Sequence, residues 1–289
     1  MCGDVYLTFM KPFTLIIATL AICVAPSFAG EDSVHKTPFY RPHSSRRVNH
    51  AKPRDVGDAV VVNAASYESG ISPGGLATIF GNNLTMVSGI VLADANPLPT
   101  NLMDVEVDVS GFPAPIYGIA DENGQDQISI QVPYEAPTGP GAAEIQVYDQ
   151  GTLVADFFTD SFTEDPGIFT YDGDFAIAED SNYSLIGPDN PAIAGEPLTL
   201  YVTGLGPLNQ NLVDGYGSPT SPPFAETVDP YQVILDGETC DVFFSGLAPG
   251  FVGLYQINFY VPSDAVSRNL QISIQSTYAN SATAVLPVQ

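Results

Sequence analysis

The residues best suited to chemistry are oxygen-bearing side chains in one short stretch. Asp121, Asn123 and Asp126 lie in a predicted loop that leads into an apolar strand. Hard cations such as Ca²⁺ favour carboxylate and amide oxygens, so these three residues are a candidate calcium site. The stretch does not match an EF-hand, because Gly124 stands at position four where the motif needs glycine at position six. A solvated turn without a metal is the alternative interpretation.

A second candidate site is the loop Gly215–Pro223, GYGSPTSPP. It carries Tyr216 and Ser218, and Tyr231 follows a few residues later. Tyrosine combines a ring that can stack on a sugar with a polar hydroxyl. Tyr216, Ser218 and Tyr231 are therefore candidate ligand-binding residues for a carbohydrate, although the chain has no tryptophan, the usual sugar platform. A proline-rich surface loop also needs no ligand to exist, so a purely structural role stays open.

The residue inventory argues against catalysis. From Asp58 onward the sequence has no histidine and no lysine, and Cys240 is its only cysteine. Ser-His-Asp, Cys-His and Ser-Lys arrangements need such a base, and zinc sites need His or Cys ligands. A carboxylate pair of the glycosidase kind remains chemically feasible, but acidic residues are too numerous for any pair to stand out. We therefore expect a protein that is not an enzyme and that uses no cofactor, calcium apart.

Charge excludes two classes of partner. Residues 58–289 contain 29 Asp and Glu against a single base, Arg268. Such a surface repels nucleic acid and anionic membranes, so we expect no direct binding to either. Solubility in a salty medium, cation binding and attraction to a basic partner all remain compatible with it.

The first 58 residues have a different character. Lys11, the apolar run Phe13–Ala25 and the order Ser27-Phe28-Ala29 predict a signal peptide at 1–29, too short in its apolar part to span a bilayer. Residues 30–58 hold all three histidines and most of the bases, without apolar periodicity. They predict a flexible basic linker, with a metal-binding or wall-anchoring arm as the alternative. The mature protein is then secreted, extracellular or held in the cell envelope.

The elements that must position the candidate sites read as short β-strands. Apolar runs are brief and broken by 26 glycines and 25 prolines. Val105, Val107 and Val109 alternate with acidic residues, the period-two pattern of a strand with one wet face. Seven or so such strands at spacings of about 8 to 12 residues are typical of a β-sandwich. Cys240 falls in one of them, which favours a buried structural role over a reactive thiol.

The strand pattern occurs twice. Gly74–Leu84 matches Gly195–Leu205 at an offset of 121, and Gln127–Pro133 matches Gln256–Pro262 at an offset of 129. The offsets change only at turns, where insertions are tolerated. The sequence therefore predicts an all-β protein of two tandem immunoglobulin-like sandwiches, 59–164 and 188–289, joined by a hairpin at 165–187.

The repeated strands carry a sharper expectation about the core. Alternate residues of a half-buried strand share one face. We expect the following residues to point into the two cores: Ile128, Ile130, Val132, Ile257, Phe259 and Val261.

A family resemblance rests on runs spread along residues 59–289. VNAASY, ISPGGLATIFGNNL, QISIQVPYE, DPGIF, TGLGPLN and GLAPGFVGLYQINFYVP resemble the Solibacter-type uncharacterized C-terminal domain of secreted acidobacterial proteins. Each half is also similar to the IPT/TIG version of the immunoglobulin-like fold. The resemblance implies an extracellular, non-enzymatic module.

Together these observations predict a secreted or cell-surface structural or adhesion module. Its partner is expected to be an extracellular protein, a polysaccharide or another envelope component. A carbohydrate-binding module and a calcium-dependent adhesion domain are the alternatives.

Overall fold

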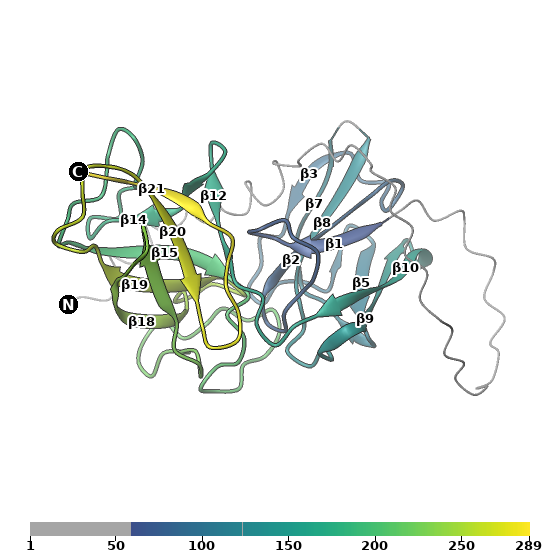
Figure 1. Cartoon of the computed structure of the whole chain (residues 1–289). Helices are drawn as coiled ribbons and strands as arrows, with labels where there is room; N and C mark the ends of the chain where they lie inside the picture. The colour runs from purple at the N-terminus through teal and green to yellow at the C-terminus, as the bar shows by residue number, and fades with distance from the viewer. Residues whose placement is uncertain (1–58, 123) are drawn as a thin grey trace, which may run out of the picture.

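The computed structural model describes residues 59–122 and 124–289. The predicted signal peptide, the basic linker and Asn123 lie outside these residues. Within the described ranges the regular structure consists of strands, in two bodies that lie next to each other (Figure 1). None of these residues forms an apolar helix long enough to cross a bilayer.

The first body is a sandwich of two antiparallel sheets. Sheet A has the order β1-β2-β8-β7-β3 and sheet B the order β10-β9-β5-β4, with β6 paired to β5. The strands of sheet A are β1 (Val60–Asn63), β2 (Leu76–Gly81), β3 (Gly89–Leu92), β7 (Ile116–Glu122) and β8 (Gln125–Gln131). Those of sheet B are β4 (Asn101–Leu102), β5 (Val105–Val109), β6 (Phe112–Pro113), β9 (Gly139–Asp149) and β10 (Thr152–Ser161). With β1, β2, β8 and β7 as strands A, B, E and D and β5, β9 and β10 as C, F and G, this is the immunoglobulin-like arrangement.

The second sandwich repeats this order. Sheet C runs β11-β15-β19-β18 with β14 paired to β15, and sheet D runs β12-β13-β21-β20-β16-β17. Sheet C contains β11 (Gly167–Ile168), β14 (Ala178–Glu179), β15 (Pro197–Thr203), β18 (Asp241–Leu247) and β19 (Tyr255–Tyr260). Sheet D contains β12 (Thr170–Tyr171), β13 (Phe175–Ala176), β16 (Gln232–Leu235), β17 (Glu238–Thr239), β20 (Arg268–Gln275) and β21 (Ala284–Val288). The described chain is therefore two tandem immunoglobulin-like sandwiches, as the sequence predicts.

Register confirms the equivalence of the two halves. Ile79 lies opposite Ile128 in the β2–β8 pair, and Leu200 lies opposite Ile257 in the β15–β19 pair. These residues are related by the offsets of 121 and 129 read from the sequence. Even the irregularity is repeated, because the register shifts between Ile116 and Gly118 in β7 and between Val242 and Phe244 in β18. A bulge kept at the same place in both copies bends the strand in the same way.

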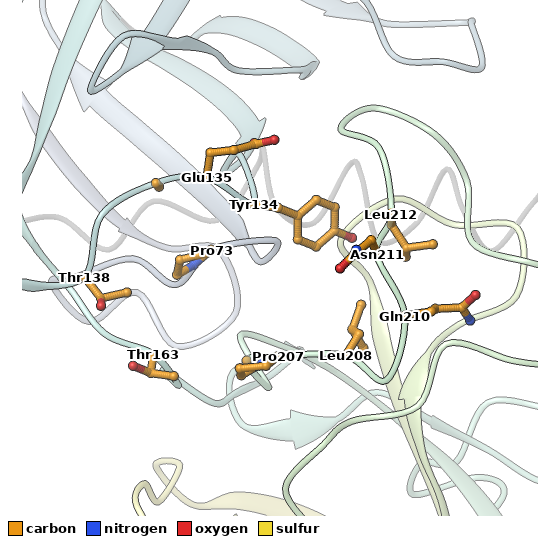
Figure 2. Close-up of a pocket in the computed structure, with 12 residues that line it drawn as sticks. Pro73, Tyr134, Glu135, Thr138, Thr163, Pro207, Leu208, Gln210, Asn211 and Leu212 are labelled. Atoms are coloured by element: carbon orange, nitrogen blue, oxygen red, sulfur yellow. The ribbon is translucent and has the colours of Figure 1, made fainter.

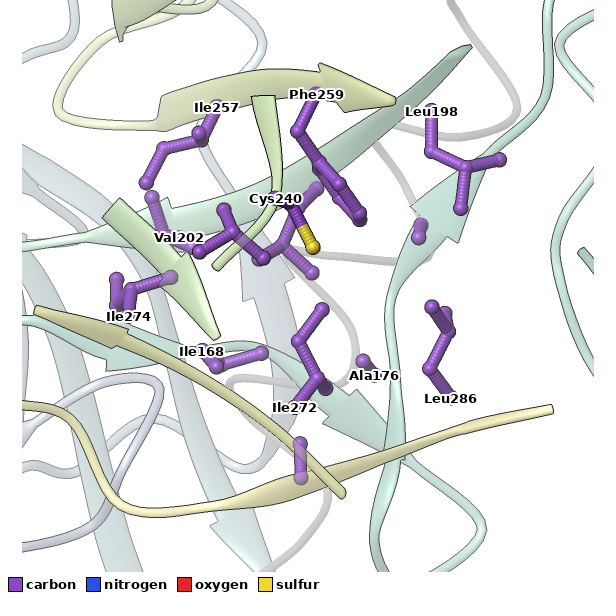
Figure 3. Packing of buried hydrophobic residues seen from close by; sticks show 14 of the residues in the cluster. Ile168, Ala176, Leu198, Val202, Cys240, Ile257, Phe259, Ile272, Ile274 and Leu286 are labelled. Carbon is purple, nitrogen blue, oxygen red and sulfur yellow. The ribbon is translucent and has the colours of Figure 1, made fainter. Parts of the chain in front are cut away.

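Each sandwich closes around the core that the repeated strands predict. All six expected core residues are at most 1% exposed: four lie in β8 and β19, and the other two are the valines that follow these strands. Figure 3 shows Ile257 and Phe259 packed with Val202, Ile272 and other apolar side chains of the second sandwich. Cys240 belongs to the same cluster, and burial raises the pKa of its thiol to about 11. The predicted burial of Cys240 is thereby confirmed.

The segment 165–187 differs from its expected role. Its Asp172-Gly173 turn does close a hairpin, β12–β13, with both turn residues at positive φ. However, β11 and β14 pair with β15, and β13 pairs with β21 in parallel. Hydrogen bonding thus builds these strands into the second sandwich, which corrects the description of the segment as a separate bridge.

Candidate functional site

The two sandwiches are in direct contact through an apolar cluster. Ala64 and Ala65 of the first sandwich belong to one buried cluster with Phe169, Tyr201 and Leu254 of the second. Burying such side chains against each other favours the docked arrangement by roughly 25 cal/mol per Å² of apolar surface. The two sandwiches therefore pack against each other and are not joined by the covalent connection alone.

Hydrogen bonds surround this cluster at the covalent joint. The Asn63 side chain donates to the carbonyl of Asp165 at 2.6 Å, and the amide of Asp165 donates to the carbonyl of Gly204 at 2.8 Å. Gly204 has φ +74, and an added Cβ would lie 2.0 Å from the Asp165 carbonyl oxygen. Only glycine fits this close backbone approach.

Further hydrogen bonds join sheet A to strand β15 and to a loop of the second sandwich. The Leu76 amide donates to Thr203 Oγ1 at 2.8 Å. The Tyr117 hydroxyl donates to the Val252 carbonyl at 2.6 Å and accepts from the Val252 amide at 3.2 Å. Burial raises the pKa of the Tyr117 hydroxyl, so it stays a neutral donor.

The loop predicted to bind a ligand completes this interface. The Gly215 amide donates to Gln131 Oε1 at 2.7 Å, and the Gly215 carbonyl accepts from the Leu98 amide at 2.8 Å. Its neighbour Asp214 accepts from the Tyr134 amide at 3.0 Å. We call residues 213–218 the clamp loop, because Asp214 and both backbone groups of Gly215 form hydrogen bonds with the first sandwich.

The three predicted ligand-binding residues do not form one surface. Tyr216 is 53% exposed, as expected for a loop tyrosine. Ser218 is buried and donates to the Ala248 carbonyl at 2.6 Å. Tyr231 is 3% exposed and its hydroxyl donates to the Glu164 carboxylate at 3.1 Å, so the expectation of an exposed Tyr231 is wrong. Nothing in the local sequence of Tyr231 distinguishes a buried tyrosine with a distant partner from an exposed one.

Two of the candidate calcium residues, Asp121 and Asp126, accept hydrogen bonds from backbone amides of the first sandwich. Asp126 is buried, and its Oδ2 accepts from the amides of Leu84 at 2.6 Å and Thr85 at 3.3 Å. Burial raises the pKa of this carboxyl, while the two amide donors act in the opposite direction. Asp121 accepts from the Gly124 amide at 3.2 Å.

Asn123, the third residue of the candidate calcium site, lies outside the described residues. In residues 59–122 and 124–289, no group of three or more His, Cys, Asp and Glu side chains is arranged to hold a metal. Calcium binding at Asp121, Asn123 and Asp126 stays a prediction.

A cleft of about 610 Å³ opens between the sandwiches. Figure 2 shows Tyr134 reaching from the first sandwich toward Asn211 and Leu212 of the second. Gln210 also lines the cleft, and its buried Nε2 finds no hydrogen-bond partner among the described residues. The cleft is thus lined by apolar and polar side chains from both sandwiches.

A pair of carboxyl groups lies beside this cleft. Burial raises the pKa of Asp214 to about 6, the Tyr134 amide opposes this shift, and a hydrogen bond and repulsion from Glu135 add to it. The raised pKa means that Asp214 takes up a proton at a higher pH than an ordinary aspartate does.

Comparison with known proteins finds structural likenesses but no family. No family model matches the chain, and no curated protein does. The Bacteroides ovatus mixed-linkage glucan utilization locus protein SGBP-B, solved with a mixed-linkage heptasaccharide, is 12% identical over 77% of this chain at a TM-score of 0.31. The I9–I11 tandem of titin is 12% identical over 76% of the chain at 0.21. Domains 4–9 of the surface layer protein SbsC are 12% identical over 81% at 0.25.

This chain spans 44%, 62% and 31% of those three chains, less than two thirds of each. At such identities and TM-scores the likeness does not extend to a shared ligand or partner. The resemblance to the Solibacter-type domain and to IPT/TIG domains stays a prediction.

Proposed function

We propose that this protein is a non-enzymatic structural or adhesion module of the cell exterior or envelope, which presents two locked sandwiches to an extracellular protein or polysaccharide. The observation that carries the proposal is the docked interface. Gly215, Gln131 and Tyr117 hold the sandwiches together far along the chain from their covalent joint. A protein that transmits or bears load on a surface needs a fixed geometry of this kind, whereas a flexible tether does not.

The chemistry of the described residues supports a non-enzymatic role. Arg268 is their one base, and it is paired with Asp236 at the surface. Residues 59–289 contain no histidine and no lysine, so they lack the base that Ser-His-Asp and Ser-Lys arrangements need.

The proposal is tested by deleting the gene and restoring it. We expect the protein to be labelled by antibody on intact cells, and the deletion to impair adhesion or envelope integrity. Expression of a Glu135→Gln, Asp214→Asn double variant in the deletion strain should restore the wild-type phenotype fully. A purely cytoplasmic protein would contradict the location, and a folded double variant that fails to restore the phenotype would contradict the non-enzymatic role.

Carbohydrate binding is the second candidate function. It is favoured by two exposed aromatic residues of sheet C, Phe243 and Tyr260, rather than by the clamp loop. Calcium-dependent adhesion through Asp121, Asn123 and Asp126 remains a third proposal, which a calcium titration addresses directly.

A further inference from the structure

Sheet C carries an exposed pair of aromatic rings on its outer face, the face turned away from the second core. Phe243 of β18 is 53% exposed and Tyr260 of β19 is 43% exposed. Their ring centroids lie 5.0 Å apart with an angle of 42° between the planes. The two strands are adjacent in the sheet (Figure 1), so the rings are held on a stiff support.

Amide side chains extend the same face along β19. Gln256 and Asn258 alternate with the core residues and are half-buried, as expected for the outer side of a strand. The Gln256 Nε2 donates to Asn258 Oδ1 at 3.1 Å, which orients both amides. Thr199 lies opposite Asn258 on β15 and adds a hydroxyl to the row. We call Phe243, Tyr260, Asn258, Gln256 and Thr199 the aromatic platform.

The equivalent face of the first sandwich is occupied by polypeptide, which gives a direct comparison. Tyr117 and Gln131 hold the positions of Phe243 and Tyr260, and they bind the second sandwich through a hydroxyl and an amide oxygen. Phe243 has no hydroxyl, so the two hydrogen bonds that Tyr117 makes to Val252 have no counterpart at that position of the second sandwich. The Tyr260 hydroxyl can bond the hydroxyl of a ligand at the exposed edge of the platform.

We infer that the aromatic platform binds a neutral polysaccharide, with pyranose rings stacked on Phe243 and Tyr260 and their hydroxyls bonded to the amides of Asn258 and Gln256. Aromatic faces and oriented amides supply the two contacts that a sugar needs, an apolar ring face and hydrogen-bond partners. The net charge of −25 opposes an anionic polymer and a second copy of this chain, while a neutral polymer meets no such repulsion. The inference rests on the proposed surface function and specifies its ligand.

The experiment uses the secreted chain and affinity gel electrophoresis with mixed-linkage β-glucan, xylan and galactomannan as neutral probes and polygalacturonate as the anionic probe. We expect at least one neutral probe, and not polygalacturonate, to retard the protein. Phe243→Ala and Tyr260→Ala should each weaken that binding at least about tenfold, because a tenfold loss corresponds to about 1.4 kcal/mol and truncating a central aromatic contact typically costs about 2 kcal/mol or more. Tyr216→Ala is the matched control, because Tyr216 is an equally exposed tyrosine in the clamp loop.

In the binding assay, the inference would be overturned by no retardation by any neutral probe, by equal binding of the platform variants, or by equal losses in the Tyr216→Ala control. Sedimentation of the same variants provides a separate check, because loss of self-association without loss of sugar binding would assign the platform to protein contacts. Thermal unfolding must be unchanged in the platform variants, which their exposure leads us to expect. If the platform variants also restore the deletion phenotype, the inference fails while the proposed surface function stands.

Discussion

Two strands at the same place in the two sandwiches have different surroundings. Along β8, the outward-facing residues Gln127, Ser129 and Gln131 are between 0% and 5% exposed. Along β19, the corresponding Gln256 and Asn258 are half-buried and Tyr260 is 43% exposed. The inward-facing residues of both strands are fully buried. The comparison shows that the duplicated fold keeps its core pattern, whereas the use of its outer face depends on what lies against it.

The largest effect should come from the shared core. Phe259→Ala should lower the free energy of unfolding by about 3 to 5 kcal/mol and the equivalent Ile130→Ala by about 2 to 5, because both side chains are fully buried. Urea unfolding measures both values. Tyr216→Ala, in the exposed part of the clamp loop, is the control and should cost little. A small loss for Phe259→Ala would contradict the equivalence of the two cores.

The interface should come next. Tyr117→Phe removes the hydroxyl that bonds both the carbonyl and the amide of Val252. We expect a loss of about 1 to 3 kcal/mol, the usual cost of leaving buried polar groups without partners. At the equivalent exposed position, Phe243→Leu should change stability far less. Similar losses at the two positions would remove the distinction between the covered face and the open one.

A smaller effect should appear on changing pH. The pKa of Asp214 is raised to about 6 in the folded state, so the folded protein binds this proton more tightly than the unfolded chain does. Its stabilising contribution is therefore complete in acid below the ordinary aspartate pKa, and it is lost as the pH rises through about 6. Asp214→Asn should flatten the fall in Tm between pH 4 and pH 7.

The size of that pH effect should stay below about 1 kcal/mol, because Asp214 is only half-buried and water screens its charge. Asp264→Asn, on an exposed loop of the second sandwich, is the control. A fall in Tm between pH 4 and pH 7 that is equally large in the wild type, in Asp214→Asn and in Asp264→Asn would contradict the assignment to Asp214.

The smallest effect concerns the candidate calcium residues in the first sandwich. If Asp121, Asn123 and Asp126 bind calcium, millimolar calcium should raise Tm beyond magnesium at matched ionic strength, because a ligand of the folded state stabilises it. Asp121→Asn should remove the difference without disturbing the buried Asp126. Identical melting curves in the two ions would exclude the site.

The sequence predicted the sandwiches well because the buried face of a strand is visible in the alternation of apolar and polar residues along that strand. Ile128, Ile130 and Val132 alternate with polar residues, and Ile257, Phe259 and Val261 repeat the pattern at a fixed offset. Since side-chain direction in a strand has a period of two, this pattern is enough to assign the residues that face the core.

The interface and the site could not be predicted in the same way. Gly215 and Gln131 lie far apart in sequence, and the hydrogen bond between them leaves no periodic signal. Tyr231 and Asp126 are polar residues buried by distant partners, so composition suggested a surface role for both. Phe243 was missed for the opposite reason. An apolar residue in a strand is normally assigned to the core, and the sequence does not reveal the bulge between Val242 and Phe244 at which Phe243 is exposed.

The separation of the clamp loop from the covalent joint has a mechanical consequence. One attachment lies at Asn63 and Asp165, and another lies where Gly215 meets Gln131. A body fixed to its neighbour at a single point can swivel, but one fixed at two separated points resists both bending and torsion. A pull on the second sandwich should therefore reach the first through the whole contact rather than through a stretched linker. The force needed to separate the sandwiches is then set by the breaking of the contacts at the clamp loop, and not by the length of the chain between them.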